Sequence, residues 1–158
     1  MICGTGVPPV IRKELGRQPV DDNISEAPLT EATLQHLREL RGKLLHLHKT
    51  LLDMERKDFE RDFGRVTSGE LLQLVINHAQ FAWLRMISAL VVQIDEMLSA
   101  EEPATLNDVK NVLEQARSLF TSSADEVFRE KYQAALQREP AVVMAHSEVA
   151  KGLGQKPA

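Results

Sequence analysis

Apolar residues recur at steps of three and four between about residue 30 and residue 150, the spacing of amphipathic α-helices. In the first such segment they form a seam for a neighbouring helix: Leu37, Leu40, Leu44, Leu47, Leu51 and Met54. We predict that this first helix starts after Thr30 and runs to about Phe63. Gly64 would then end it as a C-cap residue.

The most apolar segment runs from Leu71 to Leu98 and reads LLQLVINHAQFAWLRMISALVVQIDEML. Thr67 and Glu70 stand at capping-box spacing just before it, so we predict one long second helix that ends near Ala100. A helix that is apolar on nearly every side has to be wrapped by other helices. Because the connection after the first helix is only a few residues long, the two helices are expected to form an antiparallel hairpin.

Two further main helices and a short last one complete the pattern. Thr105 and Asp108 form a second pattern of the capping-box kind, a fourth helix is expected over about residues 124–138, and Pro140 is expected to start a short helix over residues 141–150. No β-strand pattern appears, so the predicted fold is all-α: an antiparallel bundle of four main helices plus a short C-terminal helix. Residues 1–28 hold four of the seven prolines and predict a flexible tail, residues 29–150 a single domain, and residues 151–158 a C-terminal tail.

Composition narrows the range of partners. The formal net charge of −4 gives no electrostatic reason to expect nucleic acid or an anionic membrane as a partner. Cys3 is the single cysteine and the first residues lack a signal-peptide pattern, so we expect a cytoplasmic protein. His78, Arg85 and Gln93 interrupt the most apolar segment, whose longest clean run falls far short of the ~20 residues that span a bilayer.

Polar side chains interrupt the apolar faces of the first two helices. His48 and Glu55 fall on the apolar face of the first helix, and His78 and Arg85 fall on a narrow stripe of the second. In an antiparallel hairpin the numbers of facing residues have a constant sum, and His48 with Arg85 has the same sum as Glu55 with His78. The two pairs are therefore expected to meet at successive levels of one interface.

Three interpretations of this quartet are open. The favoured one is a structural network in which Glu55 and Arg85 form an ion pair that fixes helix register. An alternative makes His48, Glu55 and His78 ligands of a transition metal in the bundle, although Arg85 puts a positive charge in the same layer. A third uses the pair of groups as general acid and base, but no nucleophile or oxyanion site accompanies them, so an enzyme is not favoured.

A helical wheel divides the second helix into a core side and an opposite side. The core side carries Leu72, Val75, Ile76, Trp83, Met86, Ile87, Leu90, Ile94 and Met97. On the other side Leu84, Val91 and Leu98 recur every seven residues among polar side chains such as Asn77 and Gln80. If nothing in the monomer covers this side, it predicts an oligomer or partner surface, and cover by a later helix is the alternative. The predicted function is therefore a non-enzymatic interaction or regulatory module that forms a homodimer through the second helix.

Three stretches together resemble a family of short, all-helical bacterial proteins of unknown function: the Phe-Ala-Trp-Leu-Arg run with the residues after it, LHKTLLDMER before it, and the Gln-Arg-Glu-Pro…Ala-His ending. The resemblance covers roughly residues 34–149 and leaves out both tails. It implies a bacterial source and supplies no mechanism. In the family pattern a proline often follows the arginine, where this chain has Met86, and a proline there would kink the second helix.

Overall fold

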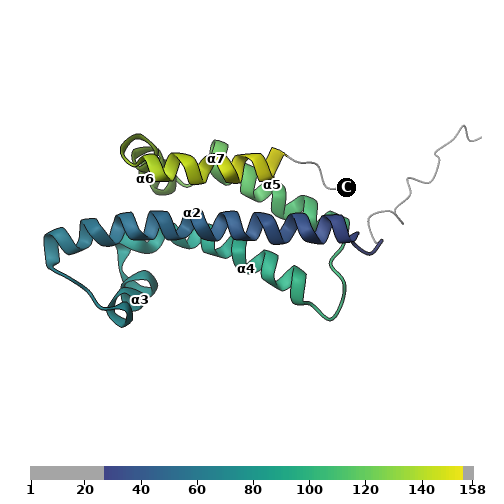
Figure 1. The fold of residues 1–158 in the computed structure, drawn as a ribbon, viewed down its shortest axis with the longest axis horizontal. Helices are drawn as coiled ribbons and strands as arrows, with labels where there is room; N and C mark the ends of the chain where they lie inside the picture. Colours follow the sequence, from purple (N-terminus) through teal and green to yellow (C-terminus); the bar gives the residue numbers. More distant parts are fainter. Residues whose placement is uncertain (1–26, 155–158) are drawn as a thin grey trace, which may run out of the picture.

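The computed structural model describes residues 27–154, and these form an all-α fold (Figure 1). The described part of the chain contains six α-helices and one 3₁₀-helix in this order: α2 (Glu31–Phe63), α3 (Ser68–Asn77), η1 (Ala79–Leu84), α4 (Arg85–Ser99), α5 (Leu106–Ser122), α6 (Glu126–Arg138) and α7 (Pro140–Gly154). The predicted all-α class is confirmed, whereas the predicted arrangement of four antiparallel main helices with a short fifth stays a prediction. The predicted flexible tail lies outside the described residues, except for residues 27 and 28.

Helix α2 is the spine of the molecule and has the predicted bounds. The Thr30 side chain accepts a hydrogen bond from Thr33 N at 3.2 Å, and Gly64 ends the helix at a positive φ of 88°. The predicted leucine seam is buried. Helix α4 packs on one side of α2 and α7 on the other, so α2 lies between the two layers in Figure 1.

The predicted continuous second helix is wrong, because the chain breaks at His78. This residue has an extended backbone (φ −89°, ψ 135°), and α3 is bent by 79° from the segment Ala79–Ser99. The Nδ1 atom of His78 accepts a hydrogen bond from Gln80 N at 3.2 Å, so its side chain caps η1 instead of extending α3. Among the described helices none is long and apolar enough by itself to cross a membrane, and only the two arms of this bend taken together pass such a test.

Helix α5 starts at its predicted capping box, α6 starts two residues after the expected residue 124, and α7 starts at the expected proline. Thr105 and Asp108 form a complete capping box at α5, Asp125 caps α6, and Pro140 is the first residue of α7. The prediction of a tail from residue 151 is wrong for residues 151–154, which continue α7. Gly152 and Leu153 are buried there.

Two side chains from other helices hold the last turn of α7. A ring nitrogen of His36 lies 2.7 Å from Gly152 O, and Arg117 Nη2 donates to Leu153 O at 2.6 Å. These carbonyls end a helix and have no partner within it. Long-range capping therefore extends α7 beyond the residues that its apolar pattern marks.

Candidate functional site

Helix α3 is the least covered apolar element in the described part of the chain. None of its ten residues is buried, although half of its sequence SGELLQLVIN is Leu, Val or Ile. Leu71, Leu74 and Val75 are half-buried on the side that faces η1. The opposite side carries Gly69, Leu72, Gln73 and Ile76, which we name the open face of α3. Leu72 is 57% exposed and Ile76 is 52% exposed.

The open face has room for a close neighbour. A Cβ atom placed on Gly69 would meet no heavy atom within 4 Å. Two uncharged amides lie beside it, with Asn77 Nδ2 donating to Gln73 Oε1 at 3.2 Å, and the nearby Glu70 carboxylate accepts a hydrogen bond from Thr67 N at 2.7 Å. In Figure 1 helix α3 lies near the end of α2 and away from α7. Such a surface is typical of a site that another molecule covers.

Arg85 holds the angle between α3 and the rest of the chain. Its Nη2 atom donates to Ile76 O and lies 3.5 Å from Val75 O. These are carbonyls of the last turn of α3, which lack intrahelical partners and carry the negative end of the helix dipole. The Arg85 guanidinium therefore caps α3 from beyond the bend.

A buried carboxylate holds the other side of the bend. Glu55 is 7% exposed, and it accepts hydrogen bonds from Gln80 Nε2 at 2.9 Å and from Trp83 Nε1 at 3.0 Å. Lys131 Nζ lies 4.0 Å from Glu55 Oε1 and donates to Gln80 O at 3.1 Å. Every acceptor here has a polar partner, so α2, η1 and α6 are joined by one satisfied network.

The predicted quartet does not come together. Glu55 bonds to Gln80 and Trp83 instead of His78, and Arg85 caps α3 instead of meeting His48. His78 packs against Phe59 with 5.4 Å between ring centroids. The bend at His78 takes α3 out of the hairpin register from which the pairs were predicted, which is why these pairings are wrong.

His48 has no role in the network, and the metal interpretation gains no support. Within residues 27–154 His48 makes no hydrogen bond, and burial lowers the pKa of its imidazole. No three His, Cys, Asp or Glu side chains in this range are placed to hold a metal ion. His48, Glu55 and His78 therefore do not form the predicted ligand set.

The predicted interface stripe is covered within the chain. Leu84 is fully buried, Val91 is 6% exposed, and Leu98 is half-buried against the core. Gln80 is partly buried on Glu55, and only Asn77 remains exposed. The predicted interface stripe is wrong, because the chain itself covers these residues.

The assignment of Leu72 and Ile76 to the core is wrong as well, because the helical wheel assumes a straight helix across His78.

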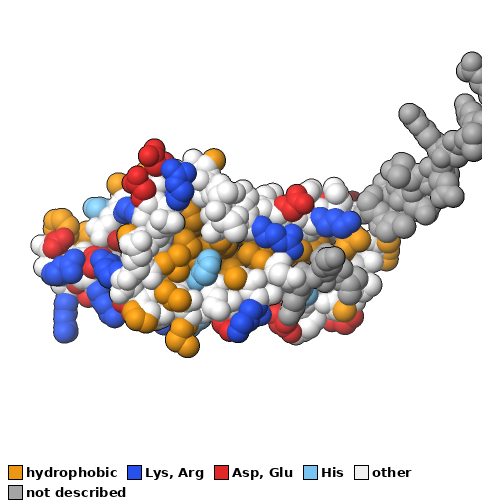
Figure 2. Space-filling view, turned by 90° about the horizontal axis from the view of Figure 1, so that it is seen from above, with side chains coloured by type: hydrophobic (Ala, Val, Ile, Leu, Met, Phe, Trp, Pro, Cys, Tyr) orange, Lys and Arg blue, Asp and Glu red, His pale blue; other side chains and the backbone are white. Residues whose placement is uncertain are grey.

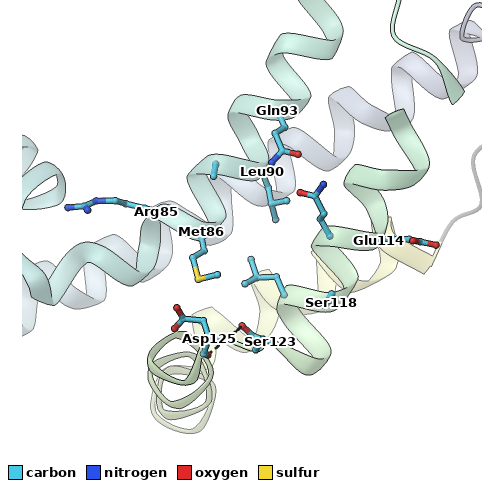
Figure 3. Close-up of a pocket in the computed structure, with 12 residues that line it drawn as sticks. Arg85, Met86, Leu90, Gln93, Glu114, Ser118, Ser123 and Asp125 are labelled. Atoms are coloured by element: carbon cyan, nitrogen blue, oxygen red, sulfur yellow. Dashed lines mark hydrogen bonds between the residues drawn. The ribbon is translucent and has the colours of Figure 1, made fainter. Parts of the chain in front are cut away.

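A second uncovered apolar surface is a groove between α4 and α5 (Figure 3). It has a volume of about 740 Å³, Met86 and Leu90 point into it, and Leu119 is among its lining residues. Ala89 and Ser118 contribute small side chains to its walls, and Gln93 and Gln115 line it near one end. The Arg85 side chain points away from the groove, toward the bend.

A smaller hollow lies between α5 and α7. It measures about 260 Å³ and is lined by Arg117, Phe120, Thr121, His146, Val149, Ala150, Leu153 and Gly154. Figure 2, which views the molecule from the side of α7, shows hydrophobic side chains exposed along this surface. The Tyr132 hydroxyl lies 2.7 Å from His146 Nδ1, and burial raises the pKa of Tyr132 and lowers the pKa of His146. Both groups are therefore neutral at pH 7.

Comparison of the chain with protein-family models, with curated proteins and with solved structures finds no match.

Proposed function

We propose that the protein is a non-enzymatic interaction module, an antiparallel helical bundle of the bacterial cytoplasm that self-associates through the open face of α3. The observation that carries the proposal is an apolar helix without a single buried residue. Burial of a Leu or Ile side chain contributes about 1.5–3 kcal/mol, so two such residues left in water are a substantial unused driving force. Contact with a second protein surface would bury these side chains and gain that free energy.

Charge supports a protein partner over a lipid surface. Helix α3 has no lysine or arginine, and from residue 61 to residue 77 two arginines balance Asp62 and Glu70. Helices that lie on membranes are typically rich in basic residues on their polar face. The α3 segment lacks this attraction for anionic lipid.

The same composition supports a second copy of this chain as the partner. Most soluble oligomers are symmetric homo-oligomers, and a symmetric contact repeats every interface charge. The open face of α3 carries no charge, because its polar member is Gln73. Two copies therefore approach through this face without like-charge repulsion.

The test is the molar mass in solution by light scattering, over a range of protein concentrations. The wild-type chain is expected to form a dimer, and Leu72→Glu and Ile76→Glu are each expected to weaken it at least tenfold. The matched control is Val127→Glu, because Val127 is a 58% exposed apolar residue on α6. This control variant should dimerise as the wild type does.

Two results would contradict the proposal. One is a wild-type chain that stays monomeric at every concentration, and the other is a dimer that neither α3 substitution weakens. Flotation with phosphatidylcholine and phosphatidylglycerol vesicles tests the lipid alternative. Vesicle binding by the wild type that Ile76→Glu abolishes, together with a monomeric mass, would replace a protein partner with a membrane.

A further inference from the structure

We propose that the surface that receives α3 is the α4–α5 groove of a second copy, so that two chains exchange their α3 helices reciprocally. This inference rests on the proposed function, since it requires a dimer. One chain carries both halves of a helix-in-groove pair: an apolar helix with an open face, and an open apolar groove. Such pairs are a recurring mode of recognition, in which anchors at i, i+3 and i+4 enter the groove.

The spacing of α3 fits this mode. Leu72 and Ile76 stand at i and i+4 on the open face, and Gly69 lies on the same side one turn earlier. The groove offers the complementary shape, because Met86, Leu90 and Leu119 form its apolar lining. Small side chains allow helices to approach closely, and Ala89 supplies one in the groove wall.

Charge complementarity supports this occupant. On the α4 wall the uncharged lining residues are Met86, Ala89, Leu90 and Gln93. Arg85 also belongs to this wall, but its guanidinium points away from the groove. On the α5 wall Gln115, Ser118 and Leu119 are uncharged, whereas Glu114 and, just after α5, Asp125 are acidic. An acidic peptide would meet like charges at these two residues, which costs binding free energy. The uncharged open face of α3 avoids that cost.

The bend prevents α3 from filling the groove of its own chain. Arg85 holds the last carbonyls of α3, and Glu55 holds η1 through Gln80 and Trp83. Helix α3 packs mainly on η1 and lies beside the end of α2, apart from α5 (Figure 1). Docking in the same chain would break all of these contacts, whereas docking in a second copy breaks none. The reciprocal arrangement also closes on itself as a two-fold dimer.

Cross-linking of single-cysteine chains tests the arrangement. In a Cys3→Ser background, Ile76→Cys and Leu119→Cys chains are mixed and treated with a short bis-maleimide. The expected product is a cross-linked pair that contains one chain of each kind, formed at least tenfold faster than with Val127→Cys as the control. Rapid cross-linking of Ile76→Cys chains to one another would show that two α3 helices meet instead. That result would overturn the inference and leave the proposed function standing.

A mixing experiment gives a second, independent readout. Ala89→Trp places a bulky ring in the groove at an exposed position and is expected to weaken the dimer at least tenfold. A mixture of Ala89→Trp and Ile76→Glu chains is expected to regain a heterodimer, because it keeps one intact helix and one intact groove. A dimer that Ala89→Trp leaves unchanged, or a mixture that stays monomeric, would overturn the exchange. A monomeric wild type would overturn the proposed function together with it.

Discussion

The indole Nε1 atom of Trp83 donates a hydrogen bond across 3.0 Å to Oε1 of Glu55, and both residues are buried. The bond joins the 3₁₀-helix that follows the bend to the C-terminal part of α2. Lys131 of α6 approaches the same carboxylate oxygen. One acidic side chain therefore fixes where three elements meet.

Glu55→Ala is expected to lower the free energy of unfolding by about 2–3 kcal/mol, because the buried indole of Trp83 and the partly buried amide of Gln80 lose their acceptor. Urea unfolding followed by circular dichroism measures the change. Asp53→Ala is the matched control, since Asp53 lies on the same helix and pairs only with exposed Lys49. Equal stability of the two variants would remove Glu55 from the role assigned to it.

Arg85→Ala is expected to loosen α3 without unfolding the bundle. The carbonyls of Val75 and Ile76 would lose their cap, and the amides of α3 should then exchange hydrogen several-fold faster. Hydrogen exchange read by mass spectrometry separates this peptide from those of α2 and α4, which should not change. Lys110→Ala, a change at an exposed position of α5, is the control, and α3 exchange that matches it would contradict the capping role.

Two glycine substitutions in and after α2 are expected to have opposite signs. Gly64→Ala should destabilise the fold by about 1 kcal/mol, because the φ of 88° is strained for an L side chain. Gly42→Ala should stabilise it by about 0.5–1 kcal/mol, because Gly42 lies in the helix interior with open space around a Cβ atom. Thermal unfolding of the two variants measures both changes, and a shift of the same sign in both would contradict this account.

Stability is expected to fall with pH below about 6.5. Burial lowers the pKa of His146 and of His48 in the folded chain, so the unfolded chain binds more protons as the pH drops from 6.5 through the lowered values. His146→Gln should flatten part of the fall in unfolding free energy between pH 7.5 and pH 5.5. His46→Gln, at an exposed position of α2, should leave the slope as in the wild type. An unchanged slope in His146→Gln would assign the fall to other groups.

Much of the fold is predictable from local signals in the sequence. Thr30, Thr67 and Thr105 start helices by satisfying backbone donors within three residues, and Gly64 ends one through its own φ. The end of α7 is different, because His36 and Arg117 supply its caps from far away in the chain. A local sequence pattern does not predict capping partners that lie far away in the chain.

The candidate site was not predictable in the same way, and His78 is the reason. The apolar residues continue through His78, so a helical wheel that assumes one continuous helix assigns sides from Leu72 to Leu98 without a break. The backbone instead changes direction there, so Leu72 and Ile76 of the predicted core side face outward. After the bend that side stays buried at Trp83 and Ile87, and Leu84 and Val91 of the other side are buried as well. The signal for the break is tertiary, since Glu55 binds Gln80 and Trp83 in a geometry that a straight helix does not provide.

The break at His78 also separates the residues that stabilise the bundle from the residues that form the exposed surface of α3. Residues that stabilise the bundle lie on α2 and after the bend, whereas the ten residues of α3 contribute no buried side chain. Substitutions at positions such as Leu72, Gln73 and Ile76 therefore change the chemistry of an exposed surface without removing a buried side chain of the bundle. Under the proposed function this helix alone determines the partner, so its sequence is free to vary while the bundle that presents it stays the same.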